Sequence, residues 1–128
     1  MIVLDASVLI AHLDATDLHH ERASELPHDA ADQALAASTI TLAEVLVGPA
    51  RAGNVDHGTA VLHDLDVTTL PLLEDARRRL AMLRAGTGLK MPDCCVLLAA
   101  EQTHSAVATF DDRLANAATE RGFAIRAS

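Results

Sequence analysis

The sequence contains no tryptophan or tyrosine, and Phe110 and Phe123 are its only aromatic residues of the FWY type. A protein that binds single strands by stacking bases needs several such rings, so this mode of recognition is excluded as the main basis of binding. The only cysteines, Cys94 and Cys95, are adjacent, a poor arrangement for a bridge within the chain, and they indicate no oxidising compartment.

Long apolar runs are also missing, since none approaches the roughly 20 residues that cross a bilayer. The N-terminal stretch has neither a preceding basic region nor a small-residue cleavage site, so no secretory signal is predicted. We therefore expect a protein of the cytoplasm that does not enter a membrane. The length of 128 residues fits one domain, 1–128, with a core of its own.

Positive charge is scarce: ten Lys and Arg stand against eighteen Asp and Glu, a formal net charge of −8. This excess of negative charge repels polyanions at long range, and it argues against a protein that only coats nucleic acid. Nine of the ten basic residues are arginine, and half of the basic residues fall between Arg77 and Lys90. A local site for phosphate is therefore still compatible with the composition.

Short apolar segments rich in β-branched residues alternate with segments of helical periodicity. The expected strands are 2–4, 34 or 35–38, 66–72, 106–110 and 123–127. The expected helices are 8–13, 17–26 with Pro27 as its end, 39–51, 55–65, 74–84, 92–104 and 111–122. Strands that alternate with helices pair in parallel, so we predict an α/β fold with a central parallel sheet of four to five strands and helices on both faces.

Carboxylates stand where these strands end or where the neighbouring helices begin. Asp5 follows the first strand, Asp111 follows the fourth, and Asp93 opens the helix that leads into the fourth. Glu44 lies beside the apolar stripe that the helix 39–51 should turn toward the sheet. Ligands of open parallel sheets bind at the carboxyl ends of the strands, so these four side chains are expected to converge.

Each aspartate taken alone is more simply explained as a helix N-cap, a role worth about 1 kcal/mol. The set is harder to explain in this way, because carboxylates 4 Å apart repel by roughly 4 kcal/mol per pair at an effective dielectric constant near 20. A divalent cation relieves this repulsion, and oxygen ligands without histidine or cysteine favour Mg²⁺ or Mn²⁺ over zinc. The four carboxylates thus predict a metal site suited to phosphodiester hydrolysis.

Three segments, "IVLDASVLIA", "ITLAEVLVGPAR" and "KMPDCCVLLAAEQTHSAVATFDDRL", together resemble the PIN-domain ribonucleases, and specifically the VapC-type toxins of bacterial toxin–antitoxin pairs. The resemblance covers almost the whole chain in order. It implies a three-layer α/β/α fold, endoribonuclease activity with Mg²⁺ or Mn²⁺, a homodimer, and inhibition by a VapB-type antitoxin. It assigns the acidic catalytic residues to Asp5, Glu44, Asp93 and Asp111, with Ser7 as the small hydroxyl residue that follows the first aspartate.

Several assignments remain open at this level. Asp5 and Asp93 are the expected metal ligands, and Asp111 is preferred to Asp112 as the fourth acid because it directly ends a strand. Arg84 and Lys90 are the expected contacts to RNA, which could be a structured tRNA or ribosomal RNA.

Three rival functions compete with this hypothesis. A signalling receiver domain would need an acidic pair near the first strand and an aspartate after the third, and a haloacid-dehalogenase phosphatase would need aspartate where Ser7 stands. A PIN fold with a silent site, kept for binding, is the remaining alternative.

Overall fold

The computed structural model describes residues 1–126, and within them the chain forms five strands and seven helices. The strands are β1 (Ile2–Leu4), β2 (Leu35–Ser38), β3 (Thr68–Leu70), β4 (Ala106–Ala108) and β5 (Ile125–Arg126). The helices are α1 (Ala6–Leu13), α2 (His20–Asp29), α3 (Thr39–Arg51), α4 (Val55–Asp64), α5 (Ala76–Thr87), α6 (Met91–Thr103) and α7 (Asp112–Glu120). The predicted alternation of strands and helices is confirmed.

All five strands are parallel and lie in the order β3-β2-β1-β4-β5. The first strand occupies the centre because its three residues are apolar and fully buried, as a strand covered on both faces must be. From β1 the chain adds β2 and β3 on one side and then crosses to β4 and β5 on the other. The boundary between β1 and β4 is therefore the topological switch point, where open α/β sheets bind their ligands.

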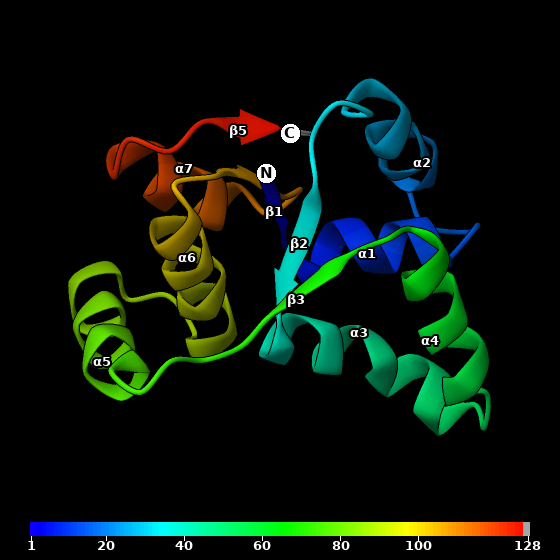
Figure 1. Cartoon of the computed structure of the whole chain (residues 1–128), viewed down its shortest axis with the longest axis horizontal. Helices are drawn as coiled ribbons and strands as arrows, with labels where there is room; N and C mark the ends of the chain where they lie inside the picture. Colours follow the sequence, from blue (N-terminus) through cyan, green and yellow to red (C-terminus); the bar gives the residue numbers. More distant parts are fainter. Residues whose placement is uncertain (127–128) are drawn as a thin grey trace.

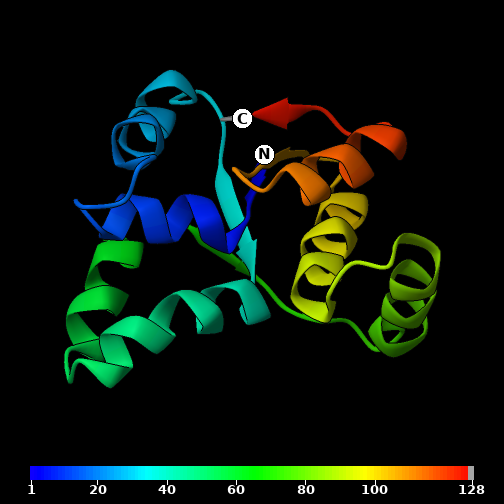
Figure 2. The same cartoon turned by 180° about the vertical axis from the view of Figure 1, so that it is seen from behind.

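Two separate cores cover the faces of this sheet. Alternate residues of β1 point to opposite faces, so Val3 packs with α5, α6 and α7 while Ile2 and Leu4 pack with α1, α2 and α3. Figures 1 and 2 show these two helix groups on either side of the strands. Helix α3 joins both groups, because its Ile40 packs against the first core and its Val45 belongs to the second. The predicted three-layer α/β/α architecture is thus confirmed.

The second helix departs from the prediction at both ends. It starts at His20 instead of Asp17, whose carboxylate accepts a hydrogen bond from the His19 N–H at 2.8 Å and so orders the preceding turn. Pro27 does not end the helix, which continues to Asp29. Proline removes one N–H donor but leaves the next turn possible, and burial of Leu26 holds that turn against the core.

Other boundaries shift by a few residues. Helix α5 runs past Arg84 to Thr87, where Gly88 ends it with a φ of 71°, a left-handed conformation that glycine adopts at little cost. The predicted third strand, 66–72, is reduced to Thr68–Leu70. The predicted last strand included Ala127, which lies outside the described residues.

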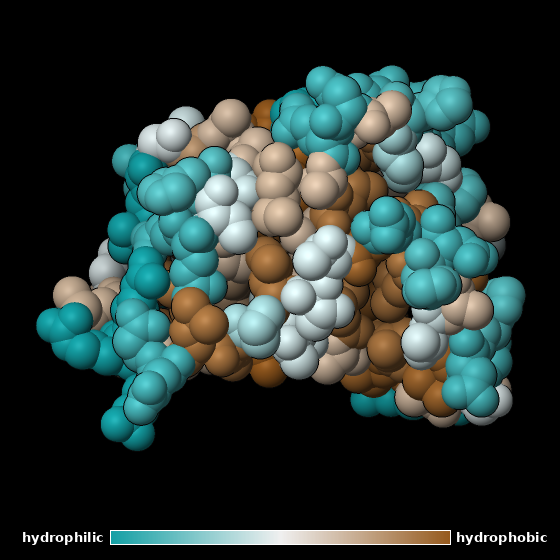
Figure 3. All heavy atoms as spheres, in the orientation of Figure 1, coloured by the Kyte–Doolittle hydropathy of each residue, from teal (hydrophilic) through white to brown (hydrophobic). Residues whose placement is uncertain are grey.

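The β3 edge of the sheet is exposed at Thr68 and Thr69. Figure 3 shows hydrophobic residues gathered on this face beside the strand, with hydrophilic residues over the α2 and α5 flanks. No helix within residues 1–126 combines the length and the apolar character that crossing a bilayer requires.

Candidate functional site

Asp5 lies at the end of β1, and two hydroxyl groups fix its carboxylate. The Ser7 and Thr109 hydroxyls each donate a hydrogen bond of 2.8 Å to the Asp5 Oδ2 atom. Asp5 is only 7% exposed, so these two hydrogen bonds take the place of water at its Oδ2 atom. Its backbone also begins α1, yet its side chain makes no capping hydrogen bond. The alternative that Asp5 is a simple N-cap is therefore wrong.

The same two hydroxyls also hold the loop after β4. Ser7 Oγ accepts from the Phe110 N–H at 3.1 Å, and Thr109 Oγ1 accepts from the Asp111 N–H at 3.0 Å. Each hydroxyl thus connects the Asp5 carboxylate to a backbone amide of the segment that carries Asp111. The separation of these two acidic residues is set by hydrogen bonds that cross from β1 to β4.

Asp111 has a structural role in addition to any chemical one. Its Oδ1 atom accepts a hydrogen bond from the Leu114 N–H at 3.1 Å, so it is the N-cap of α7. Asp112 is the first residue inside that helix. For Asp111, the explanation as an N-cap is confirmed, and the carboxylate still lies close enough to Asp93 to raise the pKa of that group.

Asp93 lies in the first turn of α6, where Lys90 is the N-cap, so it is not itself a cap. Partial burial and then the charges of Asp5, Asp111 and Glu44 raise its pKa from 3.8 to about 6, against a smaller opposite effect of Lys90. The negative charges of Asp5, Asp111 and Glu44 therefore all act on Asp93, and the charge of Asp5 also acts on Glu44. These four carboxylates belong to four separate segments of the chain.

Glu44 lies at the rim of this group. The sequence placed it beside the stripe of α3 that faces the sheet, but it is exposed, while Thr41 and Val45 fill the buried positions. Partial burial and the negative charge of Asp5 raise its pKa. Glu44 also lines a pocket of about 350 Å³ between α1 and α3, together with apolar residues such as Ile10.

The donor set fits a hard divalent cation in its chemistry. Carboxylate oxygens are the ligands that Mg²⁺ and Mn²⁺ prefer. Burial raises the pKa of Asp93, and the charges of three neighbouring carboxylates raise it further, so a bound cation would be favourable here. Within residues 1–126, no three Asp, Glu, His or Cys side chains are already close enough together to hold an ion. Binding would therefore require the side chains to draw together around the ion.

Ser7, Arg84 and Lys90 are the three residues predicted to bind the substrate, and they fall in three different environments. Ser7 is inside the carboxylate site through its bonds to Asp5 and Phe110. Lys90 is exposed immediately before α6 and close to Asp93. Arg84 is also exposed, but its guanidinium donates to the Leu89 carbonyl and so supports the α5–α6 connection.

Thr109 is the site residue that the sequence reading missed. It is fully buried and holds Asp5 in place. The available signal was a hydroxyl residue inside the apolar segment "AVATF", just before the acidic pair, because a buried hydroxyl needs a partner. Cys94 and Cys95 are buried, and burial raises the pKa of both thiols, so packing in the core accounts for them.

Comparison with known proteins gave one family and a consistent set of structures. The family model of the PIN domain matches residues 2–120. A toxin–antitoxin complex from Klebsiella pneumoniae is similar in fold, with 23% identity, a TM-score of 0.72 and 87% of each chain covered.

Two further structures agree with it. The sarcin–ricin loop cleaving toxin VapC20 of Mycobacterium tuberculosis has 17% identity, a TM-score of 0.75 and 96% of each chain covered. FitAcB from Neisseria gonorrhoeae has 23% identity and a TM-score of 0.72, with 98% of this chain and 96% of that chain covered. The search of curated proteins gave no significant match.

Proposed function

Because the chain belongs to the PIN domain family, we propose that it is the toxin of a VapBC-type toxin–antitoxin pair and an endoribonuclease that depends on Mg²⁺ or Mn²⁺. Residues 1–128 would form a single nuclease domain that acts on RNA in the cytoplasm. The observation that carries this proposal is the group of four carboxylates at the switch point of the sheet, with the raised pKa of Asp93. The fold of the similar toxin–antitoxin structures supports it.

Asp5 and Asp93 are the residues proposed to hold the cation. The Asp5 Oδ2 atom is occupied by two hydroxyl donors, which leaves Oδ1 as the oxygen to offer to an ion. A bound divalent cation would offset the charge that develops on the phosphate and activate a water molecule. Glu44 and Asp111 would complete the ligand set or orient the attacking water by accepting its hydrogen bonds. Ser7 and Thr109 would connect Asp5 to the backbone of the segment that carries Asp111 and leave the Asp111 and Asp93 side chains free to move toward the ion.

The test is cleavage of total RNA by the purified protein with Mg²⁺, Mn²⁺ or EDTA, beside an identically prepared Asp93→Asn protein. Cleavage that needs the metal and disappears in the variant is the expected result. Attack by water leaves a 5′-phosphate and a 3′-hydroxyl, so fragments with a 2′,3′-cyclic phosphate would contradict the proposal. Equal cleavage by both proteins would indicate a contaminant. No cleavage by either, with no antitoxin co-purified, would favour the silent binding domain.

A cognate VapB-type antitoxin is the proposed inhibitor. The pocket of about 350 Å³ between α1 and α3 offers an apolar wall that includes Ile10 and leads to Glu44 at the carboxylate site. An antitoxin segment with an apolar side chain and a following Lys or Arg matches both features. Inhibition of RNA cleavage by the co-expressed antitoxin should weaken in an Ile10→Asp protein that still cleaves RNA.

A homodimer is also proposed. Large apolar side chains are exposed along the segment from β3 to α6, at Leu72, Leu73, Met82 and Met91. Exposed apolar side chains of this size are typical of surfaces that pack against another protein. Light scattering should give the mass of two chains, and Leu73→Ser combined with Met82→Ser should shift the protein toward one chain.

A further inference from the structure

A second pocket opens beside the carboxylate site and belongs to none of the roles above. It has a volume of about 470 Å³, within the usual range of about 300–1,000 Å³ for sites that bind small molecules. One wall is the end of α5 and its connection to α6, and the other wall is α7. The chain continues from the first wall to Asp93 in the first turn of α6, and Asp111 caps the helix that forms the second wall.

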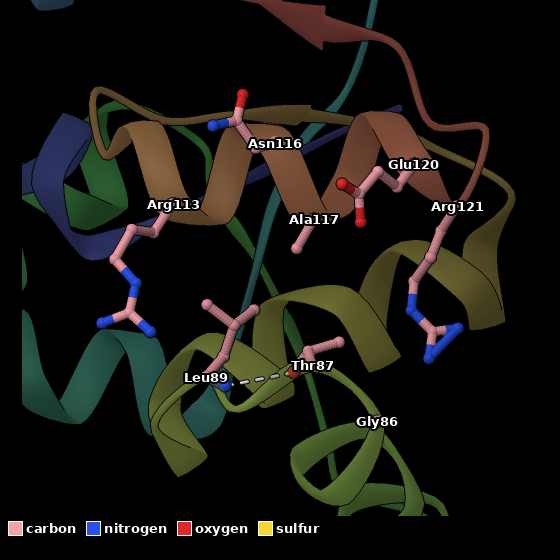
Figure 4. Close-up of a pocket in the computed structure, with 8 residues that line it drawn as sticks. All are labelled: Gly86, Thr87, Leu89, Arg113, Asn116, Ala117, Glu120 and Arg121. Carbon is pink, nitrogen blue, oxygen red and sulfur yellow. Dashed lines mark hydrogen bonds between the residues drawn. The ribbon is translucent and has the colours of Figure 1, made fainter.

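The lining of this pocket combines an apolar floor with charged ends. Leu89 and Ala117 form the apolar floor, where their side chains point toward each other (Figure 4). Arg113 and Arg121 extend from the two ends of α7 toward the α5–α6 connection. The backbones of the two arginines are eight residues apart, about 12 Å along the helix axis, and their guanidiniums lie at opposite ends of the pocket (Figure 4). They are therefore too far apart to bind the same phosphate, although one strand could reach both.

The two arginines are not equivalent. Arg121 lies 3.9 Å from the Glu101 carboxylate, and Glu120 also lines that end of the pocket, so negative charge offsets it. In the described part of the chain, Arg113 makes no ion pair. Arg113, in the first turn after Asp111, is thus the group best placed to receive a phosphate.

The distribution of charge favours the same half of the molecule. Residues 1–73 carry eleven acidic and two basic side chains, whereas residues 74–128 carry seven acidic and eight basic side chains. The pocket between α5 and α7 lies in the second part, where a polyanion meets least repulsion. The apolar pocket at Glu44 lies in the acidic first part.

We propose that the pocket between α5 and α7 binds one nucleotide of the RNA strand beside the cleaved bond. Arg113 receives the phosphate, and the base lies over the floor formed by Leu89 and Ala117. Asn116 and Glu120, at the pocket lining, offer an amide and a carboxylate to the edge of the base. This inference rests on the proposed nuclease function and adds a positioning subsite to it.

Binding without cleavage is the appropriate measurement, and Asp93→Asn protein in EDTA provides it. The probe is a short fluorescent single-stranded RNA of random sequence, followed by anisotropy at several salt concentrations. Arg113→Gln should raise the Kd about fivefold and reduce the slope of log Kd against log salt by about 0.7, the contribution of one phosphate on a single strand. Ala117→Leu fills the floor, so it should raise the Kd about fivefold with the slope unchanged.

Arg22→Gln, on α2 at the other side of the molecule, is the matched control and should bind RNA like the parent protein. Thermal melting checks that each variant is folded, and Arg113→Gln, an exposed substitution, keeps the test valid if Ala117→Leu unfolds. If the Kd and the salt slope of Arg113→Gln are unchanged while the wild-type protein cleaves RNA, the pocket does not bind a nucleotide. The proposed nuclease function is then unaffected. An Asp93→Asn protein that binds no RNA, with a wild type that cleaves none, would overturn both.

Discussion

Replacing Asp93 by asparagine should make the metal-free protein more stable, although the residue is proposed to be essential for activity. Its pKa is raised from 3.8 to about 6, so the fold disfavours the ionised carboxylate. A group of this kind lowers stability as the pH rises through that interval, and the penalty is absent below it. The asparagine side chain has nearly the same shape but carries no charge at any of these pH values.

The magnitude follows from the two pKa values. A rise from 3.8 to about 6 corresponds to about 3 kcal/mol for a fully buried group, and partial exposure to solvent reduces this to about 1.5 kcal/mol. For a chain of this length, the gain corresponds to an increase of about 4–8 °C in Tm at pH 7.5 in EDTA. The gain should shrink by about half at pH 5 and approach zero near pH 4.

Thermal melting over this pH range provides the assay, with Asp32→Asn, an exposed carboxylate in a turn, as the control that should leave Tm unchanged. Excess Mg²⁺ at pH 7.5 should then raise the Tm of the wild type more than that of Asp93→Asn. A variant that melts at or below the wild-type temperature in EDTA at pH 7.5 would refute the idea that the carboxylates repel one another in the fold.

Five further substitutions, at four positions, test structural and chemical roles. Asp111→Asn keeps a good N-cap and should abolish RNA cleavage with little change in Tm, whereas Asp111→Ala should also cost about 1 kcal/mol in urea unfolding. Thr109→Val should cost about 1–2 kcal/mol, and RNA cleavage should fall because Asp5 loses a donor. Gly58→Ala should lower the free energy of unfolding by about 1–2 kcal/mol, because the added Cβ would lie 3.0 Å from Pro49. Gly48→Ala meets nothing within 4 Å and should stabilise α3 by about 0.5–1 kcal/mol. Equal urea midpoints for the two variants would contradict this reasoning.

The parallel sheet and the grouping of the acidic residues could be predicted because both follow from local order. A buried apolar strand that ends in aspartate places the carboxylate at the carboxyl edge of the sheet, and this held for Asp5. The predicted strand 106–110 ends at Ala108 instead, so Asp111 does not directly follow it and caps α7. The exposure of Glu44 was harder to predict, because one turn of α3 has two positions beside the apolar stripe. Only tertiary packing decides which of the two is covered.

Contacts between distant segments could not be read from the sequence. The bond from Thr109 to Asp5 joins residues 104 positions apart, and nothing local in either segment specifies it. Likewise Arg84 looked free to contact RNA, but the turn after α5 presents the Leu89 carbonyl to it. The predicted helix ends were wrong where burial of side chains outweighs the helix propensity of a residue, as at Pro27.

The two cores on opposite faces of the sheet have a genetic consequence. Asp5 precedes α1, which packs in one core, while Asp93 belongs to α6, which packs in the other, so their separation depends on how both halves sit on the shared central strand. A small shear between the halves changes this separation without unfolding either one. For the toxin proposed above, selection for loss of toxicity should therefore recover substitutions at interior positions such as Leu83 and Leu26, in proteins that still accumulate in the cell.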